Sequence, residues 1–303
     1  MDSPIVTRKL SKKFRHSDAV HSLDLEVPLG SIYGLIGPNG AGKTTSIKLM
    51  MNILRPSSGV AEVLGVDSRR LSPRQFERIG YVSENQELPE EMTVEYFLRY
   101  LMPFYPTWDG ALADELVRQF GLPANRRLAH LSRGMRMKAA LASSLAYRPE
   151  LLVLDEPFTG LDPLVRQEFI QGLLERAEGT TILISSHDVA EIESFASHVG
   201  YLENGQLQFA EEMNTLAGRF RQVEVVRETP GALPLKWPKT WWRPETAATT
   251  LRFVDSRFDS EGTPAEIKRL FPDARSLSFT PMPLKEIFVA LAMAGKSGAG
   301  DMP

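Results

Sequence analysis

Short apolar runs alternate with amphipathic segments over much of the chain. Residues 32–36 form an apolar run of the length of a buried strand, and residues 45–54 repeat apolar side chains at helical intervals. Strands followed by helices in this way predict an α/β fold around a parallel sheet. Further strands are expected at residues 5–7, 23–27, 60–65, 79–82, 151–154 and 180–185, and a hairpin at 199–203 and 206–209 around Asn204-Gly205.

Helical periodicity interrupts this alternation between residues 93 and 130. Residues 95–101 are rich in aromatic side chains, and a second helix is expected over residues 109–120, ending at Gly121. We therefore expect an inserted helical subdomain at about residues 85–147. Its aromatic side chains are expected to form a core, and a face that docks a partner is the alternative.

The composition changes near residue 215. Residues 215–303 carry 13 Lys+Arg and 10 Asp+Glu, whereas the chain as a whole has a net charge of −3. Strands are expected at residues 223–226 and 249–254. Trp237, Trp241 and Trp242 are expected to pack a small core, with a contact patch for a dimer mate as the alternative. The chain is therefore divided into residues 1–216 and an accessory domain, residues 217–303, whose last residues, 295–303, are expected to be disordered.

The overall composition excludes several classes of protein. Hydrophobic residues make up 43% and charged residues 24% of the chain, as in soluble globular proteins. With no cysteine, the chain has no disulfide, thiolate metal site or cysteine nucleophile. No apolar run reaches the ~18 residues of a membrane helix, and no signal-peptide core is evident. If the protein serves a membrane process, we expect another chain to cross the bilayer.

Residues 37–44 read Gly-Pro-Asn-Gly-Ala-Gly-Lys-Thr, which is the spacing of a phosphate-binding loop. The expected strand before it and helix after it are the context that the motif requires. Glycines let backbone N–H groups approach an anion, and the helix adds the positive end of its dipole. Lys43 is expected to reach the β- and γ-phosphates of a nucleotide, and Thr44 to offer its hydroxyl to Mg²⁺.

Two carboxylates, Asp155 and Glu156, end the apolar run at residues 151–154. Acidic groups at the end of a buried strand are costly unless something pairs with them. Mg²⁺ at the phosphate loop is the expected partner of Asp155, and Glu156 is then placed to deprotonate a water. The alternative is a solvated pair of acids at the strand end.

Three other positions are candidates for contact with the nucleotide. His187 follows the run at residues 180–185, at the sheet edge where ligands bind in open α/β folds. Ser132 is a suitable N-cap for a long helix, and the N–H groups beside Arg133 and Gly134 offer a second anion site, although the spacing alone favours a plain capped helix. Phe14 is expected either to stack on the base or to be an ordinary strand aromatic.

This ordered set of motifs resembles the ATP-binding subunits of ABC transporters over about residues 4–216. The phosphate loop corresponds to Walker A and residues 151–156 to Walker B. Residues 131–135 resemble the family signature, residues 159–162 the D-loop, and His187 the switch histidine. The resemblance implies a P-loop NTPase core of ABC ATPase type, with an inserted helical subdomain, an antiparallel β subdomain and a small α+β C-terminal extension.

Two features depart from the usual family pattern. Glu84 stands where family members usually have glutamine, and Gln86 follows two residues later. The signature reads Leu-Ser-Arg-Gly-Met, a form similar to that of the ABC-2-type bacterial export ATPases. Residues 104–109 and the C-terminal region also resemble that branch.

The resemblance implies an ATPase that powers a separate multi-span permease, an exporter, from the cytoplasmic face of the membrane. Two copies, or one copy and a related ATPase, would face head to tail and clasp ATP. Alternatives are a soluble ABC-type ATPase acting on nucleic acid or ribosomes, and a P-loop kinase; no direct contact with nucleic acid is expected. Catalysis is assigned to Glu156, His187 and Lys43, nucleotide contact to Phe14, Asn39, Gly40, Gly42, Lys43, Thr44, Thr45, Ser132, Gly134 and Asp162, and Mg²⁺ contact to Thr44, Asp155 and Glu84.

Overall fold

Strand β3 (Ile32–Ile36), which leads into the phosphate loop, lies inside a sheet of order β10-β9-β3-β8-β7-β6. The computed structural model describes residues 3–15, 17–175, 179–231, 233–234 and 236–297. Strand β3 pairs in parallel with β8 (Thr181–Ser186) and β9 (His198–Glu203), and β7 (Leu151–Asp155) pairs in parallel with β8 and with β6 (Ile79–Ser83). Strand β10 (Gln206–Glu212) follows β9 through the expected Asn204-Gly205 turn, in which both residues have positive φ.

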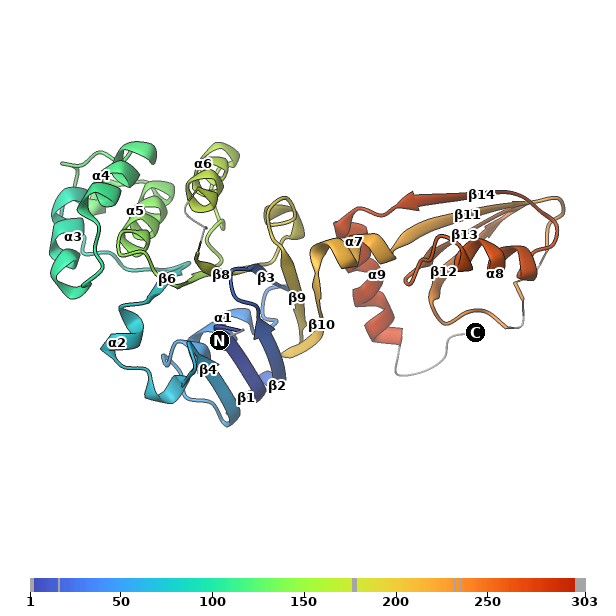
Figure 1. Ribbon diagram of the computed structural model, residues 1–303, viewed down its shortest axis with the longest axis horizontal. Helices are drawn as coiled ribbons and strands as arrows, with labels where there is room; N and C mark the ends of the chain where they lie inside the picture. The colour runs from blue at the N-terminus through green and yellow to red at the C-terminus, as the bar shows by residue number, and fades with distance from the viewer. Residues whose placement is uncertain (1–2, 16, 176–178, 232, 235, 298–303) are drawn as a thin grey trace. The chain divides into compact units, whose positions relative to one another are not determined.

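Helices cover this sheet, so its central strands are buried on both faces (Figure 1). Every residue of β7 and of β8 is buried, which explains why their sequences are apolar runs rather than alternating patterns. Helix α1 (Lys43–Met50) follows the phosphate loop, and α6 (Pro163–Leu174) follows β7. The carboxyl ends of β3, β7 and β8 therefore meet at one edge of the sheet.

A smaller antiparallel sheet has the order β2-β1-β4-β5. It comprises β1 (Ile5–Phe14), β2 (Ser17–Val27), β4 (Ser58–Val63) and β5 (Val66–Asp67). Strand β1 runs past the expected residues 5–7 to Phe14, because bulges let it keep pairing with β2. The sheet shares one apolar core with α1 and the parallel sheet.

The helical insertion contains α3 (Val94–Leu101), α4 (Gly110–Gln119) and α5 (Arg133–Leu145), which gather together in Figure 1. Each helix begins with a side-chain cap, because Thr93, Asp109 and Ser132 accept hydrogen bonds from the backbone N–H three residues on. Helix α2 (Pro73–Phe76) precedes β6. Single 3₁₀ turns occur at Ser68–Arg70, Met102–Phe104, Leu128–His130 and Val189–Glu191.

The chain divides into two compact units, Met1–Ala210 and Glu211–Pro303. The second contains α7 (Met213–Arg219) and a sheet of order β12-β13-β11-β14, formed by Trp241–Ala247, Thr250–Asp255, Arg221–Arg227 and Ala274–Pro281. Helix α8 (Gly262–Leu270) packs on this sheet, and α9 (Leu284–Ser297) follows it. The ring of Trp241 stacks on Phe253 with centroids 4.4 Å apart, and Trp237 meets both edge-on, so these tryptophans form a core as expected.

The ends of the second unit differ from the sequence-based expectation. The division falls between Ala210 and Glu211 rather than after residue 216, because Arg219 ties α7 to Glu211 and to the carbonyl of Ser256. Of the tail expected to be disordered, residues 295–297 belong to α9, and residues 298–303 lie outside the described part of the chain.

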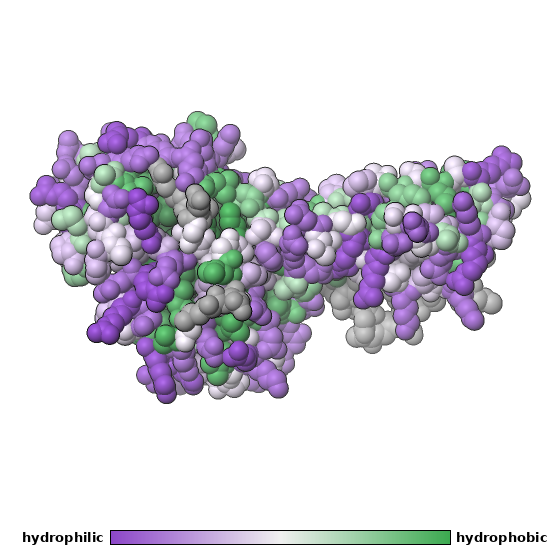
Figure 2. All heavy atoms as spheres, viewed as in Figure 1, coloured by the Kyte–Doolittle hydropathy of each residue, from purple (hydrophilic) through white to green (hydrophobic). Residues whose placement is uncertain are grey.

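Polar side chains dominate the visible surface of both units (Figure 2). Among the helices that the structure describes, none combines the length and apolar content needed to cross a bilayer.

Candidate functional site

The phosphate loop joins β3 to α1 as a tight turn that depends on glycine. Gly40 and Gly42 have φ of 81° and 103°, values that side chains other than glycine rarely adopt. A Cβ at Gly42 would lie 2.3 Å from the carbonyl oxygen of Ala19. Helix α1 begins immediately afterwards, and no side chain caps it. Its first N–H groups therefore remain available for an anion.

Lys43 is held inside the loop with only 5% of its surface exposed. Its Nζ donates to the carbonyl oxygens of Gly37 at 2.6 Å and Pro38 at 3.2 Å, and lies 3.0 Å from Oε1 of Glu156. The buried ammonium is thus paired and fixed at the mouth of the loop, where a phosphate oxygen can join its ligands.

Thr44 and Asp155 come from different elements and form a pair beside the loop. The Thr44 hydroxyl lies 3.0 Å from Oδ1 of Asp155, and the Ser185 hydroxyl donates to the same oxygen at 2.7 Å. Burial raises the pKa of Asp155, and these hydrogen bonds only partly offset that effect. A desolvated carboxylate next to a hydroxyl is a donor set that suits Mg²⁺, so these two residues fit the ion.

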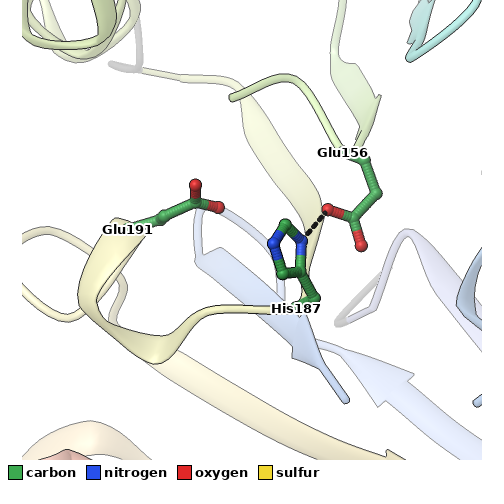
Figure 3. A group of neighbouring side chains, drawn as sticks. All are labelled: Glu156, His187 and Glu191. Carbon is green, nitrogen blue, oxygen red and sulfur yellow. Dashed lines mark hydrogen bonds and ion pairs between the residues drawn. The ribbon is translucent and has the colours of Figure 1, made fainter. Parts of the chain in front are cut away.

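Glu156 and His187 face each other at the ends of β7 and β8 (Figure 3). The Nδ1 atom of His187 lies 2.8 Å from Oε2 of Glu156, and the Thr159 hydroxyl donates to that oxygen at 3.2 Å. Burial raises the pKa of Glu156, but hydrogen bonds to His187 and Lys43 outweigh it and leave the pKa below its ordinary value. The hydrogen bond to Glu156 raises the pKa of His187. Glu156 has φ of 51°, a strained value that often accompanies function.

A cavity of about 380 Å³ connects these groups. It brings together most of the residues that the sequence assigned to nucleotide, metal or catalysis. Its lining includes Asn39, Gly40, Gly42, Lys43, Thr44, Thr45, Glu84, Glu156 and His187. Asp155 lies directly beneath it through the hydrogen bond to Thr44.

Four predicted contact residues do not line this cavity. Phe14 is half-exposed at the end of β1, with the Lys12 ammonium 5.2 Å from its ring centre. Ser132 and Asp162 cap α5 and α6, and a Cβ at Gly134 would lie 2.8 Å from a methyl carbon of Val165. Within one chain, Ser132, Gly134 and Asp162 are therefore structural groups, and their contact with nucleotide stays a prediction that needs a second copy.

Two site residues were missed from the sequence. Ser185 pairs with Asp155 in the register of β7 and β8, and Thr159 hydrogen-bonds Glu156. Both lie at the carboxyl edge of the sheet, so their position after or within a predicted strand was the available signal. Only the register shows that Ser185 lies opposite Asp155.

The structure separates the roles of Glu84 and Gln86. Glu84 lines the cavity and lies 3.3 Å from the guanidinium of Arg133. The Gln86 carbonyl accepts from the backbone N–H of Ser83, so this side chain folds back on its own loop. Glu84 is therefore the residue of this loop that reaches the cavity.

Comparison with known proteins now identifies the family. Residues 20–159, which include the phosphate loop and Glu156, match the family described as ABC transporter. The chain is 31% identical over 305 residues to the daunorubicin/doxorubicin resistance ATP-binding protein DrrA of Streptomyces peucetius, covering 95% of this chain and 92% of DrrA. The chain belongs to the ABC transporter ATP-binding proteins. It resembles the ABC-2-type branch, as its signature sequence predicted.

Two further comparisons agree with this assignment. The probable multidrug ABC transporter ATP-binding protein YbhF of Escherichia coli is 36% identical over 214 residues, which cover 68% of this chain but only 36% of YbhF. A solved ATP-binding subunit of an ABC transporter superposes with a TM-score of 0.65 at 27% identity, covering 71% of this chain and 92% of that chain. The first unit is thus an ABC-type ATPase, and ATP is its nucleotide.

Proposed function

We propose that this chain hydrolyses ATP to power a separate membrane permease, and that the permease is an exporter. The observation that carries the proposal is the cavity in which Lys43, Glu156 and His187 converge beside the Thr44–Asp155 pair. Support for export comes from DrrA, a resistance protein by name, which is similar along nearly its whole length. The permease would place this chain at the cytoplasmic face of a membrane.

The side chains divide the chemistry of hydrolysis among them. The loop N–H groups and Lys43 bind the phosphates, and Thr44 and Asp155 would hold Mg²⁺, which neutralises phosphate charge when bound. Glu156, kept ionised by Lys43 and His187, accepts a proton from the attacking water. His187 stabilises that carboxylate and is placed to donate toward the γ-phosphate. Catalysis then depends on positioning and charge stabilisation.

A second copy would complete the site. Gly134 packs against Val165, so the N-termini of α5 and α6 lie together. Arg133 and Gly134 are in the first turn of α5, so their backbone N–H groups have no partner within the helix, whereas α6 begins with Pro163, which has no N–H. Ser132 and Asp162 begin these helices. In a head-to-tail dimer, the start of α5 would bind the γ-phosphate held by the partner's loop, because its N–H groups favour an anion, and Asp162 would lie beside that phosphate. ATP would thereby hold the dimer together until hydrolysis releases it.

A groove next to the nucleotide cavity fits a permease segment. It has a volume of about 540 Å³, an apolar floor that includes Leu88, Leu128 and Met137, and charged groups that include Glu87 and Arg136. Glu84 lines both the groove and the nucleotide cavity. A permease loop bound in this groove would therefore contact Glu84, which also lines the nucleotide cavity. Such a shared residue can couple ATP binding and hydrolysis to movement of the permease.

The decisive experiment compares Glu156→Gln with Glu150→Gln in the purified chain. These residues flank the two ends of β7, so both variants remove one acid from the same strand. E156Q is expected to bind Mg-ATP, to lose turnover by at least about 100-fold, and to form an ATP-dependent dimer detectable by light scattering. E150Q should behave like the wild type. Turnover by E156Q at the wild-type rate would exclude Glu156 as the base.

The partner is tested by affinity purification from membranes. A multi-span membrane protein should co-purify with the tagged chain, and the amount recovered should depend on whether ATP is present. Substitution of the exposed Arg136 by Glu in the groove should reduce that recovery without changing ATP binding. Recovery on ribosomes or DNA instead would overturn the assignment to a permease.

A further inference from the structure

Arg133 and Glu84 each lie in a motif that departs from the usual family pattern, and the structure pairs them. They are separated by 49 residues, yet Nη2 of Arg133 lies 3.3 Å from Oε1 of Glu84. Arg133 is the first residue of α5, directly after the Ser132 cap, and Glu84 follows β6. Arg133 belongs to the Leu-Ser-Arg-Gly-Met signature and Glu84 stands in place of the usual glutamine, so the ion pair needs the charged residue at each of these two positions.

The pair lies between the nucleotide cavity and the groove beside it. Glu84 lines both, and Arg133 lines the groove. The guanidinium of Arg133 also packs against the loop after β7, where a Cβ at Gly160 would lie 3.4 Å from it. Arg133 therefore links the start of α5 to the loops that follow β6 and β7.

A phosphate can compete with Glu84 for Arg133, because both side chains of the pair are partly exposed. The side chains of Arg133 and Glu84 are 45% and 34% exposed, and exposed ion pairs are individually weak. Arg133 adds a full positive charge to a helix start that already favours anions. A phosphate presented there carries more charge than one carboxylate and accepts bidentate hydrogen bonds from arginine.

We infer that Glu84 and Arg133 form an electrostatic latch, in which Glu84 neutralises Arg133 until the γ-phosphate bound by a second copy displaces it. The inference rests on the proposed head-to-tail dimer. Arg133 is then a further phosphate-binding residue, contributed in trans, and Glu84 is a positioning residue that acts through it. The latch makes the nucleotide-free chain a poor dimerisation partner. When a second copy presents ATP, Arg133 at the start of α5 exchanges Glu84 for the γ-phosphate.

The test measures epistasis between the two charges in the Glu156→Gln background. The readout is the Mg-ATP concentration that gives half-maximal dimerisation, followed by light scattering. Glu84→Gln is expected to lower that concentration roughly two- to fivefold, and Arg133→Gln to raise it by a similar factor. Adding Glu84→Gln to Arg133→Gln should change nothing further, because Glu84 acts only through Arg133.

A second ion pair in the same unit supplies the matched control. Arg78 and Glu150 are 2.5 Å apart, with side chains 44% and 53% exposed, and they precede β6 and β7 at the opposite edge of the sheet. Arg78→Gln and Glu150→Gln should leave the ATP dependence unchanged. High salt should reduce the effect of Glu84→Gln, because screening weakens the latch.

A stability cycle on the nucleotide-free chain tests the pairing itself. Single and double Gln variants of Glu84 and Arg133 should show a coupling of about twofold or more in the unfolding equilibrium constant. Zero coupling would overturn the latch. The latch would also be overturned if Glu84→Gln changed the Mg-ATP concentration for half-maximal dimerisation by the same factor in the presence and absence of Arg133. That result is expected if Glu84 acts as a metal ligand instead. If Glu156→Gln stays monomeric at saturating ATP, both the proposed dimer and the displacement of Glu84 by a γ-phosphate are refuted. The stability cycle would still measure whether Glu84 and Arg133 interact in the nucleotide-free chain.

Discussion

Nδ1 of His187 lies 2.8 Å from Oε2 of Glu156, so the histidine that we propose as the switch and the carboxylate that we propose as the catalytic base form a pair. The pair links the ends of two parallel strands whose sequences lie about 30 residues apart. The hydrogen bond raises the pKa of His187, and it helps to lower that of Glu156. Each group thereby favours the charged form of the other.

The first prediction concerns the titration of His187 in the nucleotide-free protein. Its pKa should lie above the ordinary value of 6.5, and Glu156→Gln should return it toward that value because the charged partner is lost. The raised pKa means that the pair stabilises the fold fully below about pH 6.5 and that this contribution is lost as pH rises through the folded-state pKa. Imidazole NMR signals, assigned with His187→Gln, measure the shift; an unchanged pKa in Glu156→Gln would contradict the pairing.

The second prediction concerns the buried carboxylate of Asp155. Because burial raises its pKa, the ionised group costs stability at neutral pH and that cost disappears as pH falls through the folded-state pKa. Asp155→Asn should therefore stabilise the nucleotide-free chain at neutral pH, while abolishing the Mg²⁺-dependent part of ATP binding. Thermal unfolding with and without Mg-ATP measures both effects. A variant that is destabilised yet still stabilised by Mg-ATP would refute the assigned role.

The third prediction distinguishes two costs of replacing a glycine that has positive φ: backbone strain, and a steric clash between the new Cβ and a neighbouring backbone atom. Gly42 and Gly30 both have positive φ, but only at Gly42 would a Cβ collide with another backbone atom, the Ala19 carbonyl oxygen. Gly30→Ala should cost about 1 kcal/mol from strain alone, and Gly42→Ala at least about 2 kcal/mol together with ATP binding. Denaturant unfolding and an ATP titration compare them. Equal costs would mean that the close approach contributes nothing.

The fourth prediction concerns the aromatic core of the second unit. Trp241 is 2% exposed and stacks on Phe253, whereas the neighbouring Trp242 is only half-buried. Trp241→Ala should destabilise that unit by about 3–5 kcal/mol, because it leaves a large cavity. Trp242→Ala should cost far less. Hydrogen exchange on residues 221–255 of the full chain resolves the two, and similar losses of protection would place the core elsewhere.

The sequence by itself determined the nucleotide-binding fold of the first unit, because the motifs that specify it are contiguous in the chain. Residues 37–44 require their strand and helix on either side, because the loop binds phosphate only when the backbone turns between those elements. The apolar runs before Asp155 and His187 likewise predicted parallel strands ending at one edge. Even the capping role of Ser132 follows from local hydrogen bonding, which depends on only a few residues of sequence.

Only the tertiary structure decided which distant side chains meet. The pairs Asp155–Ser185 and Glu84–Arg133 depend on strand register and on the placement of α5, which no local pattern contains. Local propensity and motif spacing act over a few residues, whereas contacts across a sheet edge arise from the packing of the whole unit.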